Sequence, residues 1–123
     1  MRTVISLLLL LAAGPACAEW AKLSENDSSV TYIDRSTLHV QGDIRRIEIL
    51  NDLKWSRGNN VNSVMILMDY DCKYARRRPF SQTSYAGQMG TGKVMDSGLT
   101  RAEWNKTTRV MEDGRQVDFV CSL

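Results

Sequence analysis

The chain has 123 residues, with 16 Lys and Arg against 14 Asp and Glu, so its formal net charge is only +2. This near-balance argues against a nucleic-acid-binding domain, which typically carries a strongly basic surface. Beyond an apolar run near its start, the sequence has no stretch long enough to cross a membrane. Low-complexity segments and internal repeats are absent as well, so the composition predicts one small globular domain.

The first eighteen residues have the three parts of a secretory signal peptide. Arg2 supplies a positive start, residues 4–13 form an unbroken apolar run, and Ala16-Cys17-Ala18 provides a cleavage site. We therefore predict a signal peptide at residues 1–18 and a mature domain at residues 19–123. Two alternatives are a short membrane anchor and lipidation of Cys17, although the residues before Cys17 lack the leucine usual in lipoprotein signals.

Removal of this leader would leave two cysteines, Cys72 and Cys121. Two cysteines in an exported chain are a disulfide candidate with a single possible pairing. A domain of this size buries a modest core, so one cross-link would matter for its stability. The pairing would also leave no thiol to act as a nucleophile.

The first half of the mature chain reads as short strands separated by polar turns. Strands are predicted at residues 21–23, 30–33, 44–50, 64–72 and, more weakly, 80–85. Gly42 and Asp43 mark a hairpin turn. In the strand that follows them, Ile47 and Ile49 share one face while Arg46 and Glu48 occupy the other.

Three local signals refine this pattern. The strand at 64–72 is apolar on both faces in its first half, which predicts a central position in the sheet. Asp34 is placed to cap a single helical turn. Pro79 is predicted at the edge or the start of a strand, because proline cannot donate a ladder hydrogen bond.

The C-terminal segment changes its period. Val110, Val117 and Val120 recur at helical spacings, and Thr107 or Thr108 could cap the start of such a helix. The alternation of Val117, Phe119 and Cys121 fits a strand equally well. Periodicity alone therefore leaves helix and strand both open.

Gly87, Gly90 and Gly92 crowd a tight connection before residues 94–95. The spacing up to Lys93 matches a phosphate-binding P-loop, but Val94 stands where that loop needs a Ser or Thr hydroxyl. We favour a structural turn, and we expect Gly90 or Gly92 to be the glycine most sensitive to substitution.

The densest charged run is the candidate ligand-binding patch. It comprises Lys73, Arg76, Arg77 and Arg78. Clustered arginines suit carboxylates, sulfates and phosphates, so the run predicts an acidic partner, with a simple solvated surface as the alternative. Tyr74 and Phe80 could add stacking contacts.

No convincing catalytic or metal-binding set is visible in the sequence. Asp69 and Asp71 would share one face of a strand, and pairing with the nearby arginines is favoured over a hydrolase-like acid–base role. His39 is the only histidine, and it has no obvious set of co-ligands. We therefore predict a non-enzymatic protein with no metal and no cofactor.

Several short motifs resemble a known family when taken in their order along the chain. They are Tyr32-Ile33-Asp34, Asp69-Tyr70-Asp71-Cys72 with the arginines after it, residues 84–92, Trp104 and the closing Val120-Cys121. This order resembles the surface-adhesin protein E-like family of Gram-negative bacteria. The resemblance implies an α+β fold: a small antiparallel β-sheet with one C-terminal helix, at residues 108–121, tied to it by a disulfide.

The same resemblance implies an exported non-enzymatic binding module, because an adhesin of this family binds host matrix proteins such as vitronectin and laminin. The expected partner is then a host matrix protein or an acidic glycan, and the expected location is the periplasm or the cell surface of a Gram-negative bacterium. The alternative is a periplasmic, envelope-associated structural or assembly factor that acts through protein contacts.

Overall fold

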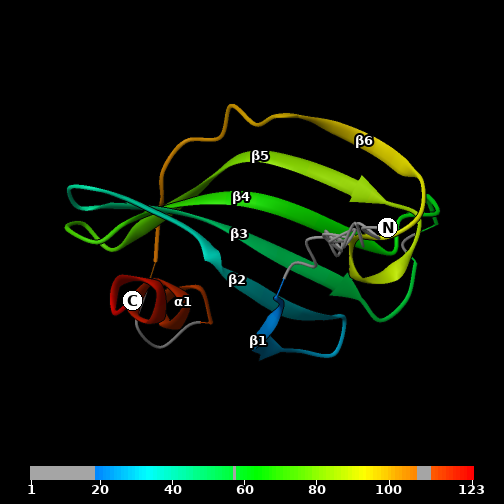
Figure 1. Cartoon of the computed structure of the whole chain (residues 1–123), viewed down its shortest axis with the longest axis horizontal. Helices are drawn as coiled ribbons and strands as arrows, with labels where there is room; N and C mark the ends of the chain where they lie inside the picture. The colour runs from blue at the N-terminus through cyan, green and yellow to red at the C-terminus, as the bar shows by residue number, and fades with distance from the viewer. Residues whose placement is uncertain (1–18, 57, 108–111) are drawn as a thin grey trace, which may run out of the picture.

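A computed structural model describes residues 19–56, 58–107 and 112–123 of the chain. The predicted signal peptide, Cys17, Thr108 and Val110 lie outside these described residues. Within them, the chain forms one antiparallel sheet and one C-terminal helix, as the resemblance implied (Figure 1).

Six strands form a meander in which each strand pairs with the next one along the chain. They are β1 (Ala21–Glu25), β2 (Ser29–Gln41), β3 (Ile44–Leu53), β4 (Ser63–Asp71), β5 (Arg76–Tyr85) and β6 (Val94–Leu99). A short strand, β7 (Asn105–Lys106), pairs with the beginning of β5, whereas β6 pairs with its end. The predicted strands and the Gly42-Asp43 hairpin turn are confirmed, and β4 lies inside the sheet between β3 and β5.

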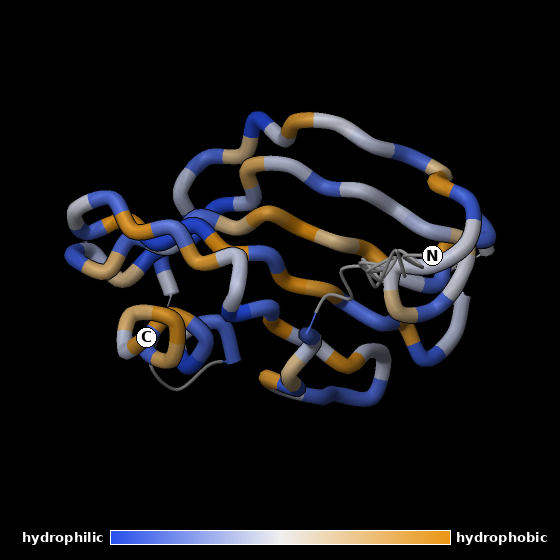
Figure 2. The backbone as a smooth tube through the Cα atoms, in the orientation of Figure 1, coloured by the Kyte–Doolittle hydropathy of each residue, from blue (hydrophilic) through white to orange (hydrophobic). Residues whose placement is uncertain are grey.

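Alternation along the strands places most of the apolar core on one face of the sheet, although the buried Leu50 points to the other face, near Gly90. The register pairs Ile33 with Ile49 and Ile47 with Met68, so these four side chains point to the same side. Ile47 and Ile49 are buried, and Arg46 and Glu48 point to the opposite face as predicted. Figure 2 shows the hydrophobic stretches of β3 and β4 and those of the helix.

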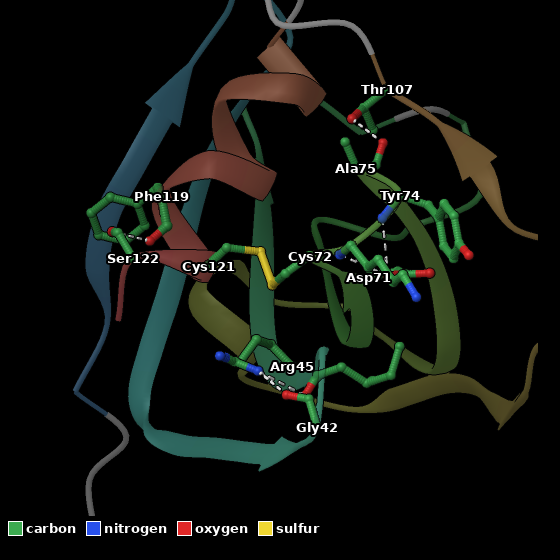
Figure 3. The surroundings of a disulfide bond; sticks show 12 residues. Gly42, Arg45, Asp71, Cys72, Tyr74, Ala75, Thr107, Phe119, Cys121 and Ser122 are labelled. Atoms are coloured by element: carbon green, nitrogen blue, oxygen red, sulfur yellow. Dashed lines mark hydrogen bonds between the residues drawn. A yellow bond between two sulfur atoms is a disulfide. The ribbon is translucent and has the colours of Figure 1, made fainter.

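The helix α1 (Glu112–Cys121) covers this apolar face. Val117 and Val120 are buried against the isoleucines and Tyr70, which settles the sequence ambiguity in favour of a helix. Cys121 at its end is bonded to Cys72, just after β4 (Figure 3). At the other end, the Ser24 hydroxyl donates to the Glu112 carboxylate at 2.7 Å, so the helix is fixed to the sheet at both ends.

Two predictions about β2 and β5 are wrong, and both fail at strand irregularities. Asp34 does not begin a helical turn, because β2 continues through a register shift where Asp34 accepts hydrogen bonds from the Ser36 backbone and hydroxyl. Pro79 lies in the middle of β5, opposite Met68, at another register shift. A bulge accommodates a residue that lacks an N–H donor, so proline is tolerated there.

The glycine segment is a structural turn between the antiparallel strands β5 and β6. Gly90 and Gly92 have positive φ angles of 68° and 79°. The Gly90 N–H donates to the Ser63 hydroxyl, and the Met89 N–H donates to the Asp52 carboxylate, so the turn is bonded to β3 and β4. A P-loop instead follows a strand and opens a helix, so the nucleotide interpretation does not fit this segment.

Candidate functional site

The predicted run of basic residues is divided between the two faces of the sheet. Because neighbouring residues of a strand alternate, Arg76 and Arg78 point to the open face, opposite the helix, whereas Arg77 points to the helix side. Lys73 lies in the exposed turn between β4 and β5. The structure therefore places Lys73, Arg76 and Arg78 together and separates Arg77 from them.

A buried carboxylate joins two arginines of the open face. Asp69 on β4 lies opposite Arg46 on β3 and Arg78 on β5. Arg46 donates two hydrogen bonds to it, from Nε at 2.7 Å and from Nη2 at 3.0 Å, and Arg78 Nε lies 3.8 Å away. The hydrogen bond to Asp69 raises the pKa of Arg46 above its ordinary value, so this guanidinium remains charged.

A second buried carboxylate, Asp71, has the same role beside the turn. Its oxygens accept hydrogen bonds from Arg76 Nε at 2.8 Å and from the backbone N–H groups of Lys73 and Tyr74 at 3.0 and 3.3 Å. Burial opposes ionisation of this carboxyl, but these three donors outweigh burial and lower the pKa of Asp71. The predicted pairing of Asp69 and Asp71 with arginines is thus confirmed.

Aromatic rings stack on the same arginines. The guanidinium of Arg46 lies 3.7 Å from the Phe80 ring centroid, and that of Arg78 lies 4.2 Å from the Trp104 ring centroid. Arg76 contacts two rings, Trp104 at 4.9 Å and Tyr74 at 5.1 Å. Stacking and ion pairing together restrict the arginine side chains to fixed orientations.

These residues form one continuous feature, which we call the arginine–aromatic surface. It comprises Arg46, Tyr74, Arg76, Arg78, Phe80 and Trp104. The sequence pattern pointed to Tyr74, Phe80 and two of the arginines, but it missed Arg46 and Trp104 as members. The alternation of β3 carried a signal for Arg46, whereas Trp104 reaches the site through the two-residue strand β7, which has no recognisable pattern.

Arg77 serves a different purpose on the helix side. Its Nη1 donates to Gln116 Oε1 at 2.6 Å, and the Tyr70 hydroxyl donates to the same oxygen at 3.4 Å. Burial raises the pKa of Tyr70 to about 12, although the nearby Arg77 opposes the shift. Arg77 also lines a cleft of about 370 Å³ beside the beginning of α1. The main contact of Arg77 therefore connects the sheet to the helix, through Gln116.

Among the residues that the structure describes, no cluster of His, Cys, Asp and Glu could hold a metal ion. His39 is exposed and pairs across the strands with Arg46. Across the same residues, no helix combines the length and the hydrophobicity needed to span a membrane.

The fold and the disulfide define a small α+β domain in which one helix is fastened to an antiparallel sheet whose other face carries charge. Residues 20–122 match the model of the surface-adhesin protein E family, so the chain belongs to this family. No curated protein sequence matches the chain.

Solved structures with the same fold come from Haemophilus influenzae. Crystal form II of its protein E is 14% identical, with a TM-score of 0.63 over 84% of this chain and 87% of that one. Protein E from non-typeable Haemophilus influenzae is also 14% identical, with a TM-score of 0.61 over 84% of this chain and 75% of that one. At this identity, the likeness concerns the fold.

Proposed function

We propose that the chain is an exported, non-enzymatic adhesin that binds an acidic region of a host matrix partner through its arginine–aromatic surface. Membership of the surface-adhesin protein E family supports the adhesin class. The observation that carries the choice of site is the set of three arginines, Arg46, Arg76 and Arg78, held side by side on the open face by buried carboxylates and aromatic rings.

This arrangement suits binding better than catalysis. Asp69 and Asp71 are each engaged by an arginine, so neither is placed as a general base with a substrate in reach. The arginines still present part of their surface to solvent, with side chains between 32% and 40% exposed. Oriented guanidinium groups can form paired hydrogen bonds with an anion at a small entropic cost.

The test is binding to immobilised host matrix proteins, with laminin and vitronectin as the first candidates. We expect saturable binding that falls at least tenfold in an Arg76→Gln/Arg78→Gln double variant and weakens as salt is raised. Lys93→Gln, which removes an exposed cation beside the glycine turn, is the matched control and should bind like the wild type. Equal binding by all three proteins would contradict the proposed site.

Location is tested separately, because an adhesin must reach the outside of the cell. Protease treatment of intact cells should degrade the protein if it is displayed. Full protection in intact cells, with degradation after permeabilisation of the outer membrane, would instead favour a periplasmic envelope factor.

A further inference from the structure

We infer that the ligand of the arginine–aromatic surface is a linear sulfated polysaccharide that lies across the strands of the sheet. This inference rests on the proposed function and sharpens it by naming the class of ligand and the path it takes. It follows from the register of the strands, from the burial of the carboxylates and from the stacking of the aromatic rings on the arginines.

The register arranges the cations in two rows that run across the sheet. In one row, Arg78 on β5 and Arg46 on β3 lie on either side of Asp69 on β4, which is the cross-strand partner of both. Directly opposite residues of antiparallel strands share a face. Since neighbouring strands lie about 4.8 Å apart, the cations of this row span about 10 Å of the open face.

The second row lies beside the first, nearer to the β4–β5 turn. Lys106 on β7 is paired with Arg76 on β5, which is paired with Asp71 on β4. Lys106 therefore joins the open face as an exposed cation, although the sequence pattern did not include it in the site. Lys73 extends this end of the surface, with its ammonium group 5.4 Å from the Tyr74 ring.

A ligand that approaches the two rows meets the cations and not the carboxylates that pair with them. Asp69 and Asp71 are only 2% and 4% exposed, whereas the cations reach solvent. Counted together, Lys73, Arg46, Arg76, Arg78 and Lys106 exceed these two carboxylates by a formal charge of +3. A polyanion gains most from such a group, because each neutralised charge releases condensed counterions.

The direction of the rows favours a polysaccharide over an acidic peptide. An extended peptide repeats its same-side carboxylates about every 7 Å, which matches the spacing of alternate residues along a single strand. Along β5 it would meet Arg76 and Arg78 only, because the residues that follow them in this strand are uncharged. A chain laid across the strands instead reaches cations of β7, β5 and β3, because Lys106 and Arg76 form one row and Arg78 and Arg46 form the neighbouring row.

The rings also argue for recognition of sulfate groups rather than of sugar faces. Trp104 and Phe80 are already covered by guanidinium groups at 3.7–4.9 Å, so they orient arginines and do not offer an open stacking platform. Arginine is weakly hydrated, and its planar set of donors suits both carboxylates and phosphate-like oxyanions such as sulfate. The half-buried Glu48, one row further along the same face, limits the path of a polyanion on that side.

The test is calorimetric titration of the mature protein with heparin fragments of defined length. We expect binding that weakens steeply as salt is raised, and at least tenfold weaker binding of chemically desulfated heparin and of poly-glutamate of similar length. Poly-glutamate that binds as tightly as heparin would overturn the inference in favour of an acidic peptide ligand.

Variants test the path across the strands. Arg46→Gln and Lys106→Gln, which lie on either side of Arg76 and Arg78, should each weaken heparin binding about fivefold or more. Arg77→Gln is the matched control, since Arg77 lies between two site arginines but on the opposite face; Lys54→Gln is a second control, remote on the chain. Thermal melting shows that each variant is folded, and unchanged binding by the first two variants would overturn the inference.

Comparison with the matrix-protein assay separates this inference from the proposed function. If matrix proteins bind in a manner that depends on Arg76 and Arg78 while heparin does not bind, the polysaccharide inference is wrong and the proposed function stands. If neither binds, both are wrong.

Discussion

The two faces of the sheet are built from the same strands but have different roles: one packs against the helix and the other carries charged groups. On the helix side, Ile47, Tyr70 and Val120 have no exposed surface, and a disulfide holds the cover in place. On the open side, the buried carboxylates Asp69 and Asp71 lie under arginines and rings. Adjacent residues of β4, such as Tyr70 and Asp71, therefore belong to different functional environments.

This division means that stability and binding are separable at single positions. Burial of apolar area supplies most of the folding free energy, and it is concentrated on the helix side. The charged groups of the open face contribute less to folding, because ion pairs near water are screened. Substitutions on the helix side are expected to lower stability most, and those on the open face to change pH and ligand dependence.

The largest expected effect is loss of the disulfide. Cys72 and Cys121 are separated by 49 positions, and the chain-entropy model gives about 4 kcal/mol for a loop of this length. Cys121→Ser should therefore lower the melting temperature by about 15 °C and make the C-terminal segment sensitive to protease. Reduction of the wild type should reproduce both effects. Thiols that react with alkylating reagent before any reductant is added would contradict the prediction.

A smaller effect is expected at Asp71 on the open face. The pKa of Asp71 is lowered in the folded state, so its stabilising effect is complete above the ordinary carboxyl pKa of about 4 and is lost as the pH falls through the folded value. Asp71→Asn should cost about 2 kcal/mol at pH 7, typical of a charged hydrogen bond. Urea denaturation at a series of pH values measures this difference, which should shrink below pH 4. A difference that stays constant down to pH 2 would show that the charge is not responsible.

The glycine turn belongs to the open side of the sheet, because its backbone N–H groups donate to Asp52 and Ser63 there. A Cβ at Gly87 would lie 2.5 Å from Thr91 Oγ1 and 2.7 Å from Thr91 O, and one at Gly92 would lie 3.1 Å from the Gly87 nitrogen. Gly90 has more room, but its φ is positive. Alanine should thus cost about 2 kcal/mol or more at Gly87, less at Gly92, and about 1 kcal/mol at Gly90.

Thermal melting of the three alanine variants measures this order, with Lys93→Ala as the control that should melt like the wild type. The sequence pattern singled out Gly90 and Gly92, and the structure adds Gly87 as the most restricted position. Three variants that melt unchanged would show that the segment is not a fixed structural turn.

The smallest expected effect is a gain in stability at Ala75. This residue lies in the turn between β4 and β5 with a φ of +50°, and its carbonyl accepts hydrogen bonds from the backbone and hydroxyl of Thr107 (Figure 3). Glycine relieves the left-handed strain but adds entropy to the unfolded chain, so Ala75→Gly should stabilise by at most about 1 kcal/mol. Urea denaturation compares it with Ala21→Gly, in an exposed strand of ordinary backbone, which should lose stability.

The sequence pattern was most informative where a short stretch determines its own structure. Alternation predicted that Ile47 and Ile49 lie on one face of the sheet and Arg46 and Glu48 on the other. The glycines predicted the tight turn. The sequence pattern failed at Asp34 and Pro79, because a bulge depends on how the neighbouring strand pairs. It left the last segment undecided between helix and strand, since Val117 and Val120 become core residues only through contact with the sheet.

The candidate site was harder to predict for the same reason. Four consecutive or nearly consecutive basic residues read as one patch, yet strand alternation sends Arg77 to the helix side. Arg46 and Trp104 enter the site from segments more than twenty residues away on either side of the run. Only the pairing of β3, β4, β5 and β7 brings them together, and no local signal encodes that pairing.

The meander order of the sheet separates two kinds of loop closure, the short ones of the hairpins and the long one made by the disulfide. Each hairpin forms between neighbours in the chain, so the sheet can assemble by short loop closures. The Cys72–Cys121 bond instead closes a loop of 49 positions that contains β5, β6, β7 and α1. Loss of this bond should therefore release the helix from the sheet while the hairpins, which close only short loops, keep their pairing.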